Sequence, residues 1–115
     1  MNSIETPLFV KTHDLNVWLL LHTQRFPRHL RHSYTQRLEN LAFEFEECLL
    51  MANQSRGTTR RQFLQTADGK LTCLRAFLRY ARSLELLGGR QIHYAAEQLD
   101  QLGRLLGAWL KGVDR

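Results

Sequence analysis

Apolar residues recur at alternating steps of three and four in the middle of the chain, and this spacing strongly limits what the sequence can fold into. Between residues 60 and 87 the repeat consists of Leu64, Ala67, Leu71, Leu74, Leu78 and Ala81. Residues at this spacing form one stripe along an α-helix, and a heptad stripe must pack against other helices. The segment therefore predicts a long helix inside a helical bundle.

Four helical segments succeed one another along the chain, and no stretch shows the two-residue alternation of a strand. We expect helices over residues 8–26, 28–53, 60–87 and 90–112. Pro27 stops or kinks the first helix, and Gly88-Gly89 ends the third because glycine readily adopts the left-handed conformation. Residues 53–61 form a basic loop in which Thr58 or Thr59 is placed to cap the next helix.

The length of 115 residues fits one domain. The expected fold class is all-α, a four-helix bundle running up, down, up and down over residues 1–115. In the first helix, residues 17–21 are apolar on every side, which predicts burial between neighbours. Cys48 and Cys73 lie among apolar residues and are interpreted as reduced core residues.

Positive charge is concentrated in one part of the chain. The formal net charge is +5, and residues 54–82 alone carry seven Lys/Arg against one acidic residue. The segments 1–53 and 83–115 have net charges of −1 and 0. Such concentration favours a nucleic acid or another polyanion as partner.

Within the basic segment, Arg75, Arg79 and Arg82 form a row along one edge of the third helix, beside its apolar stripe. Asp68 is the only acidic residue near this row in the sequence. One interpretation makes the arginines solvated flank residues whose stems cover the core edge. The other makes them a row that binds phosphate or a second subunit, and the charge argument extends this interpretation to Arg60 and Arg61.

A second basic patch is expected around residues 25–37, at the start of the second helix. Its members are Arg25, Arg28, His29, Arg31, His32 and Arg37. His29 and His32 could share a helical face, but no Cys, Asp or Glu nearby completes a metal site. We expect no metal, no cofactor and no catalytic residues, because the sequence contains no nucleophile–base pair and no phosphate-binding glycine loop.

The third helix carries more apolar surface than a single bundle needs. Phe63, Cys73, Phe77 and Tyr80 widen its apolar face beyond the leucine stripe. In the fourth helix, Gly103 and Gly107 leave a flat strip where another backbone could approach, with tight packing inside the bundle as the alternative. Together these features predict a homo-oligomer whose interface includes Phe63, Phe77, Tyr80, Gly103 and Gly107.

No segment is long and apolar enough to cross a membrane, and the amino terminus shows no secretion signal. We therefore expect a cytoplasmic protein.

Several sequence blocks resemble one known family. They are His-Asp-Leu-Asn-Val-Trp-Leu at 13–19, Phe-Pro-Arg-His-Leu-Arg at 26–31, Gln-Arg-Leu-Glu-Asn at 36–40, Ala-Asp at 67–68, Leu-Arg-Ala-Phe-Leu-Arg at 74–79 and Leu-Gly-Arg-Leu-Leu-Gly-Ala-Trp-Leu-Lys at 102–111. In order and spacing they resemble the accessory variability determinant (Avd) proteins of diversity-generating retroelements. A broader relative is the family of four-helix bundle proteins encoded in intervening sequences of bacterial 23S ribosomal RNA genes.

The Avd resemblance implies a non-enzymatic accessory subunit that assembles into a homopentameric barrel with a basic surface. Its implied partners during mutagenic cDNA synthesis are the reverse transcriptase of the retroelement and the template-repeat RNA, with DNA as a further candidate. Arg75 and Arg79 match the two arginines of the family's Leu-Arg-x-x-Leu-Arg motif. The chain departs from the family pattern at residues 33–35, Ser-Tyr-Thr, where relatives often have Leu-Gly.

The resemblance leaves two hypotheses. In the first, the protein is the retroelement accessory subunit and its basic residues hold RNA beside the polymerase. In the second, it is an interaction protein of the intervening-sequence type, and the arginine row meets an acidic protein or ribosomal RNA. A neighbouring reverse transcriptase gene with paired template and variable repeats would support only the first. A DNA-binding helical bundle ranks lower, because no helix-turn-helix spacing is evident.

Overall fold

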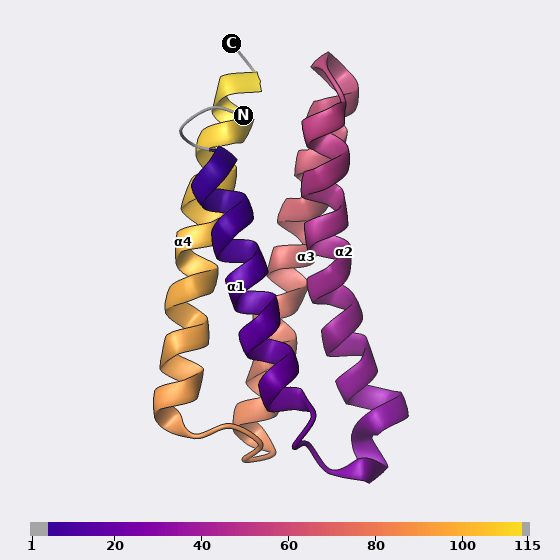
Figure 1. Ribbon diagram of the computed structural model, residues 1–115, viewed down its shortest axis with the longest axis vertical. Helices are drawn as coiled ribbons and strands as arrows, with labels where there is room; N and C mark the ends of the chain where they lie inside the picture. Colours follow the sequence, from indigo (N-terminus) through magenta and orange to yellow (C-terminus); the bar gives the residue numbers. More distant parts are fainter. Residues whose placement is uncertain (1–4, 114–115) are drawn as a thin grey trace.

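A computed structural model describes residues 5–113, which form four α-helices and no strand. In chain order these are α1 (Glu5–Thr23), α2 (Gln36–Gln54), α3 (Gly57–Ser83) and α4 (Gly89–Val113). Successive helices run in opposite directions, and α1 lies diagonally across from α3 (Figure 1). Helices α1 and α3 each pack on both α2 and α4. The all-α expectation is confirmed for the described residues.

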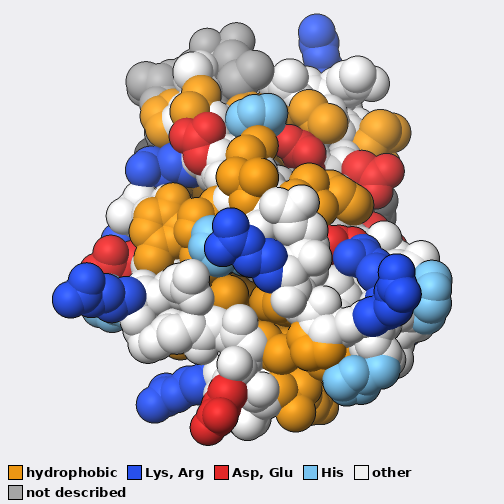
Figure 2. All heavy atoms as spheres, turned by 60° about the horizontal axis from the view of Figure 1, so that its bottom comes forward, with side chains coloured by type: hydrophobic (Ala, Val, Ile, Leu, Met, Phe, Trp, Pro, Cys, Tyr) orange, Lys and Arg blue, Asp and Glu red, His pale blue; other side chains and the backbone are white. Residues whose placement is uncertain are grey.

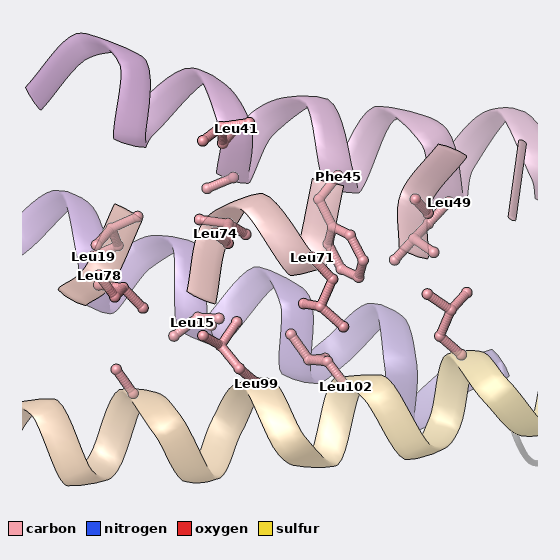
Figure 3. Packing of buried hydrophobic residues seen from close by; sticks show 14 of the residues in the cluster. Leu15, Leu19, Leu41, Phe45, Leu49, Leu71, Leu74, Leu78, Leu99 and Leu102 are labelled. Carbon is pink, nitrogen blue, oxygen red and sulfur yellow. The ribbon is translucent and has the colours of Figure 1, made fainter. Parts of the chain in front are cut away.

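The core lies along the axis of the bundle, where the apolar stripes of the four helices meet (Figure 3). All six residues of the α3 repeat are buried, as the spacing predicted. In α4, residues at the same heptad spacing are buried from Ala95 to Trp109, while Ile92 and Val113 at the two ends of this stripe are partly buried. Each fully buried leucine contributes roughly 1.5–3 kcal/mol relative to an exposed one. Heptad spacing thus identified the core of these two helices.

Helix α1 is less buried than the sequence indicated. Its inner side, with Leu15 and Leu19, packs into the core. Its outer side leaves Val10, Val17 and Leu21 exposed at 54%, 44% and 56%. The expected burial of residues 17–21 between neighbouring helices is therefore only partly met among residues 5–113, where α1 packs mainly on α2 and α4.

The first connection is more irregular than expected. Helix α1 ends at Thr23, and the extended backbone of Pro27 (φ −54°, ψ 139°) separates it from the next helical turn. This is a 3₁₀ turn, η1 (Arg28–Leu30), and a π-helical turn, η2 (Arg31–Thr35), then precedes α2. The regular helix therefore starts eight residues later than predicted. The π-turn coincides with the Ser-Tyr-Thr stretch that departs from the family pattern.

The α2–α3 connection is shorter than the predicted loop. Only Ser55 and Arg56 separate the helices, and α3 begins at Gly57 with a positive φ of +57°. Neither Thr58 nor Thr59 caps α3, since both lie inside the helix. Arg60 instead caps the preceding helix, because its guanidinium donates hydrogen bonds to the carbonyls of Ala52 (2.9 Å) and Asn53 (3.3 Å).

The α3–α4 connection corrects a further prediction. Helix α3 ends at Ser83, and Glu85 takes the left-handed conformation (φ +57°) that was assigned to Gly88-Gly89. The Leu86 N–H donates to the Ala81 carbonyl at 2.8 Å, which completes a Schellman-type ending. Leu87 is then buried in the core, so the chain must turn before the glycines. Gly88 instead precedes α4, which begins at Gly89.

The two cysteines are both free thiols, but neither belongs to the buried core. Cys48 is half-buried on α2 and Cys73 is exposed on α3. The interpretation as a core residue is therefore wrong for Cys73, whereas Cys48 is partly buried and packs against the core.

Candidate functional site

The arginine row of α3 borders a groove between α3 and α4. The groove has a volume of about 240 Å³. Its lining consists of Arg75, Leu78, Arg79 and Arg82 from α3 and Ile92, Ala96 and Leu99 from α4. The three arginines therefore share one wall, as their spacing predicted, and the side chains between and opposite them are apolar.

Arg75 is held within the chain at one end of this groove. Its Nη1 donates to Asp100 Oδ1 at 2.6 Å, and its Nη2 donates to the Leu99 carbonyl at 3.1 Å. Asp100 neutralises Arg75, so Asp68 is not the nearest acidic partner of the row. Both side chains of the pair are partly exposed, at 40% and 57%, which limits the contribution of the ion pair to about 1 kcal/mol.

Gly103 explains how Arg75 reaches across α4. A Cβ atom at Gly103 would lie only 2.9 Å from Arg75 Nη2. At Gly107, four residues further along, a Cβ would meet nothing within 4 Å. Of the two predicted interface glycines, Gly103 therefore provides room for an arginine of its own chain, and Gly107 faces open space.

Arg79 and Arg82 differ from Arg75. Both side chains are exposed. Within residues 5–113 neither one makes a side-chain hydrogen bond or an ion pair. Arg82 also lies in the last turn of α3, where the helix dipole favours a cation. These two guanidinium groups are available to an external anion.

The groove continues into a wider hollow of about 690 Å³ at the α3–α4 connection. Arg82, Ile92 and Ala96 line both. The hollow adds Glu85, Leu87, Gly88, Gly89 and His93 to the lining. His93 Nε2 lies 2.9 Å from Glu97 Oε1, so a carboxylate also approaches the outer rim.

Arg60 and Arg61 lie far from the row. They belong to the first turns of α3, whereas Arg79 and Arg82 are near its other end, so the length of the bundle separates them (Figure 1). Besides capping α2, the Arg60 guanidinium carbon lies 5.8 Å from the ring centre of Trp109. Arg61 is half-buried. The basic segment of the sequence therefore does not form one basic surface.

The second basic patch lies at the end of the bundle that carries η1, η2 and the α3–α4 connection. In this region Lys, Arg and His side chains surround exposed hydrophobic side chains (Figure 2). Arg28, His29 and His32 are exposed. Arg31 is paired with Glu39, which also accepts a hydrogen bond from Thr23 at 2.6 Å. In the described part of the chain no three His, Cys, Asp or Glu residues are grouped where they could hold a metal ion.

The residues expected at an oligomer interface have different environments. Phe77 is half-buried and stacks on Tyr34, with ring centres 6.1 Å apart. The Tyr34 hydroxyl donates to the Phe77 carbonyl at 2.5 Å, and burial raises the pKa of Tyr34 to about 12. Phe63 is half-buried, whereas Tyr80 is 55% exposed. Phe77 thus packs in an aromatic cluster of its own chain, although it was expected at an interface between subunits.

Other apolar side chains are exposed where sequence reasoning did not place an interface. They include Val10, Val17 and Leu21 on α1 and Phe43, Leu50 and Met51 on α2. The apolar run in the middle of α1 was a signal for this surface, but it was assigned to the interior. The groove residues Ile92 and Ala96 and the Arg75 partner Asp100 were also missed, because the pairing of α3 with α4 cannot be read from either helix alone.

The fold and the site define a class of protein, an antiparallel four-helix bundle with apolar side chains on its surface and a groove bordered by arginines that have no partner among residues 5–113. The chain belongs to the bAvd-like family, whose sequence pattern matches residues 8–113. This Avd-like family consists of accessory, non-catalytic proteins and is associated with diversity-generating retroelements. No curated protein matches the sequence. Among residues 5–113, no helix combines the length and the hydropathy needed to cross a membrane.

Proposed function

We propose that the protein is the accessory subunit of a diversity-generating retroelement. In this role it binds the reverse transcriptase and the template-repeat RNA and supports mutagenic cDNA synthesis without catalysing a reaction itself. Membership of the bAvd-like family carries the proposal. The exposed Arg79 and Arg82 side chains beside the groove support it, since exposed guanidinium groups bind carboxylates and phosphates well.

Not all of the predicted arginines are equally available for such contacts. Arg75, Arg60 and Arg31 already bind groups of their own chain. We assign the external contacts mainly to Arg79, Arg82 and Arg28. With phosphate contacts dominating, binding to RNA would be salt-sensitive and show little sequence preference.

We further propose that the protein works as a homo-oligomer, with five subunits as the family resemblance implies. The exposed apolar side chains of α1 and α2 support an oligomer. A helical segment that is apolar on all sides, such as residues 17–21, is normally covered, and exposed apolar surface can mark an interaction site. A second copy would cover this surface while leaving the arginines of the groove free.

The test is the solution mass of the purified protein by light scattering, alone and with the reverse transcriptase and template RNA. A pentamer that joins both partners supports the proposal. A monomer that joins neither refutes it. RNA affinity as a function of salt then tests the arginines: Arg28→Glu is expected to reduce the salt slope by about 0.7 for single-stranded RNA. Arg104→Glu is the matched control, because Arg104 is exposed on α4 and lines neither basic region.

A further inference from the structure

The groove between α3 and α4 combines an apolar floor with cationic groups on one side only. Leu78 and Leu99 form the buried part of the floor, Ile92 is half-buried and Ala96 is exposed. Arg79 and Arg82 project from the α3 side and lack partners within the described residues. A ligand that fits this groove needs an apolar group to cover the floor and an anionic group to meet the arginines.

Acidic side chains lie at both ends of this arginine wall. Asp100 is bound to Arg75 at one end, and Glu85 lines the adjoining hollow next to Arg82 at the other. A nucleic-acid strand carries a negative charge on every phosphate, so a strand laid along the groove would meet both carboxylates. A ligand with only one or two anionic groups can bind the central arginines and avoid them.

The groove also lacks what single-stranded RNA sites commonly provide. Unstacked bases usually bind on aromatic rings. The lining of the groove contains only aliphatic residues and arginines. Aliphatic floors of this kind instead accept leucine-like or aromatic anchors of a protein segment, as in helix-in-groove recognition.

Another surface of the molecule suits RNA better. Residues 22–38 contain Arg25, Arg28, Arg31 and Arg37 and no acidic residue. Only Arg31 of these four has an ion-pair partner, Glu39, among residues 5–113. Glu39 is already bound to Arg31 and Thr23, so residues 22–38 offer Arg25, Arg28 and Arg37 as cations that lack a carboxylate partner among the described residues, which favours a polyanion.

We propose that the α3–α4 groove docks a protein segment of the reverse transcriptase. The segment carries one aliphatic or aromatic anchor on the apolar floor and one or two carboxylates that bind Arg79 and Arg82. This assignment rests on the proposed function, since it names the partner of the groove within the same complex. The template RNA binds elsewhere, at the η1–η2 end.

The experiment measures two affinities for each variant of the full chain, one for the purified RNA-free reverse transcriptase and one for the template-repeat RNA alone. Ala96→Trp fills the groove without changing charge, and Ala76→Trp is its control on the exposed outer side of α3. Arg79→Glu reverses one groove charge, and Arg104→Glu is its control. Circular dichroism and thermal unfolding establish that each variant is folded.

Ala96→Trp and Arg79→Glu are each expected to weaken reverse transcriptase binding about tenfold or more, which corresponds to about 1.4 kcal/mol. The RNA affinity of both variants and both affinities of the controls should stay within about twofold of the unmodified protein. If the groove variants lose RNA affinity instead, the groove is an RNA site and the proposal is overturned. The proposal is also overturned if Ala96→Trp and Arg79→Glu bind the reverse transcriptase as tightly as the unmodified protein. If the unmodified protein binds neither partner, the proposed function itself fails.

Discussion

The two glycines of α4 give a sharp test of the structure, because they look alike in the sequence and differ in their surroundings. Alanine is more favourable than glycine in a helix interior by roughly 0.5–1 kcal/mol. At Gly107 the added methyl group meets nothing within 4 Å. Gly107→Ala should therefore raise the free energy of unfolding by about 1 kcal/mol.

Gly103→Ala should behave differently, since its methyl group would lie 2.9 Å from Arg75 Nη2 and 3.6 Å from Leu71 Cδ2. The guanidinium is the flexible end of its side chain and moves away more easily than the buried leucine. Moving it weakens an exposed ion pair worth up to about 1 kcal/mol and a hydrogen bond to a carbonyl worth about 1 kcal/mol. The loss of these two interactions then cancels or slightly exceeds the gain in helix propensity, so Gly103→Ala should not raise the free energy of unfolding.

A double-mutant cycle with Arg75→Ala isolates this clash. Without the guanidinium, Gly103→Ala should recover the stabilisation seen for Gly107→Ala, so the coupling between residues 75 and 103 is expected to be about 1 kcal/mol. Urea unfolding at a fixed protein concentration measures each free energy, because assembly changes apparent stability. An equal gain for both glycines in the unmodified background would show that Arg75 does not lie over Gly103. A loss of stability or of solution mass in Gly107→Ala would show that another chain packs there.

Three further predictions test other contacts. Tyr34→Phe removes the hydroxyl that donates to an α3 carbonyl at 2.5 Å and should lower the free energy of unfolding by about 1 kcal/mol. Burial raises the pKa of Tyr34 from 10.0 to about 12, so the unmodified protein should lose stability as the pH rises between these values. The Tyr34→Phe variant should lose less stability over the same pH range. Arg60→Ala should lower the free energy of unfolding by about 1–2 kcal/mol through loss of the α2 cap and should leave RNA affinity unchanged. The control Arg56→Ala should change neither the free energy of unfolding nor the RNA affinity. Cys73 is exposed and should react with a thiol reagent faster than Cys48, whose pKa is raised by burial, so slow modification of both would indicate that another subunit covers Cys73.

The apolar spacing was sufficient to predict the interior of the bundle. The α3 stripe from Leu64 to Ala81 is buried throughout, because a heptad pattern allows only one side of the helix to face its neighbours. Helix ends were predicted less well. Glu85 takes a left-handed conformation that costs a non-glycine residue roughly 1 kcal/mol, and local preference alone would have placed it at a glycine. Burial of the following Leu87 outweighs that cost.

The candidate site could be predicted only in part. The sequence placed Arg75, Arg79 and Arg82 on one edge of a helix, which depends on helix geometry alone. It could not indicate that Asp100 neutralises the first of them, since that pairing depends on how α3 is aligned with α4. The apolar floor was missed for the same reason, because half of it comes from a helix that begins after the α3–α4 turn.

The structure divides the arginines by what each one already binds. Arg31, Arg60 and Arg75 connect separate elements, since they bind Glu39, the end of α2 and α4 respectively. Each would have to give up a partner of its own chain before binding a ligand, and that loss would offset part of the new interaction. Arg79 and Arg82 have no such partner in the described part of the chain, so an anion gains the full interaction there. A charge count over residues 54–82 therefore overestimates the binding surface, and the arginines that matter for recognition are those that the fold leaves without a partner beside an apolar groove.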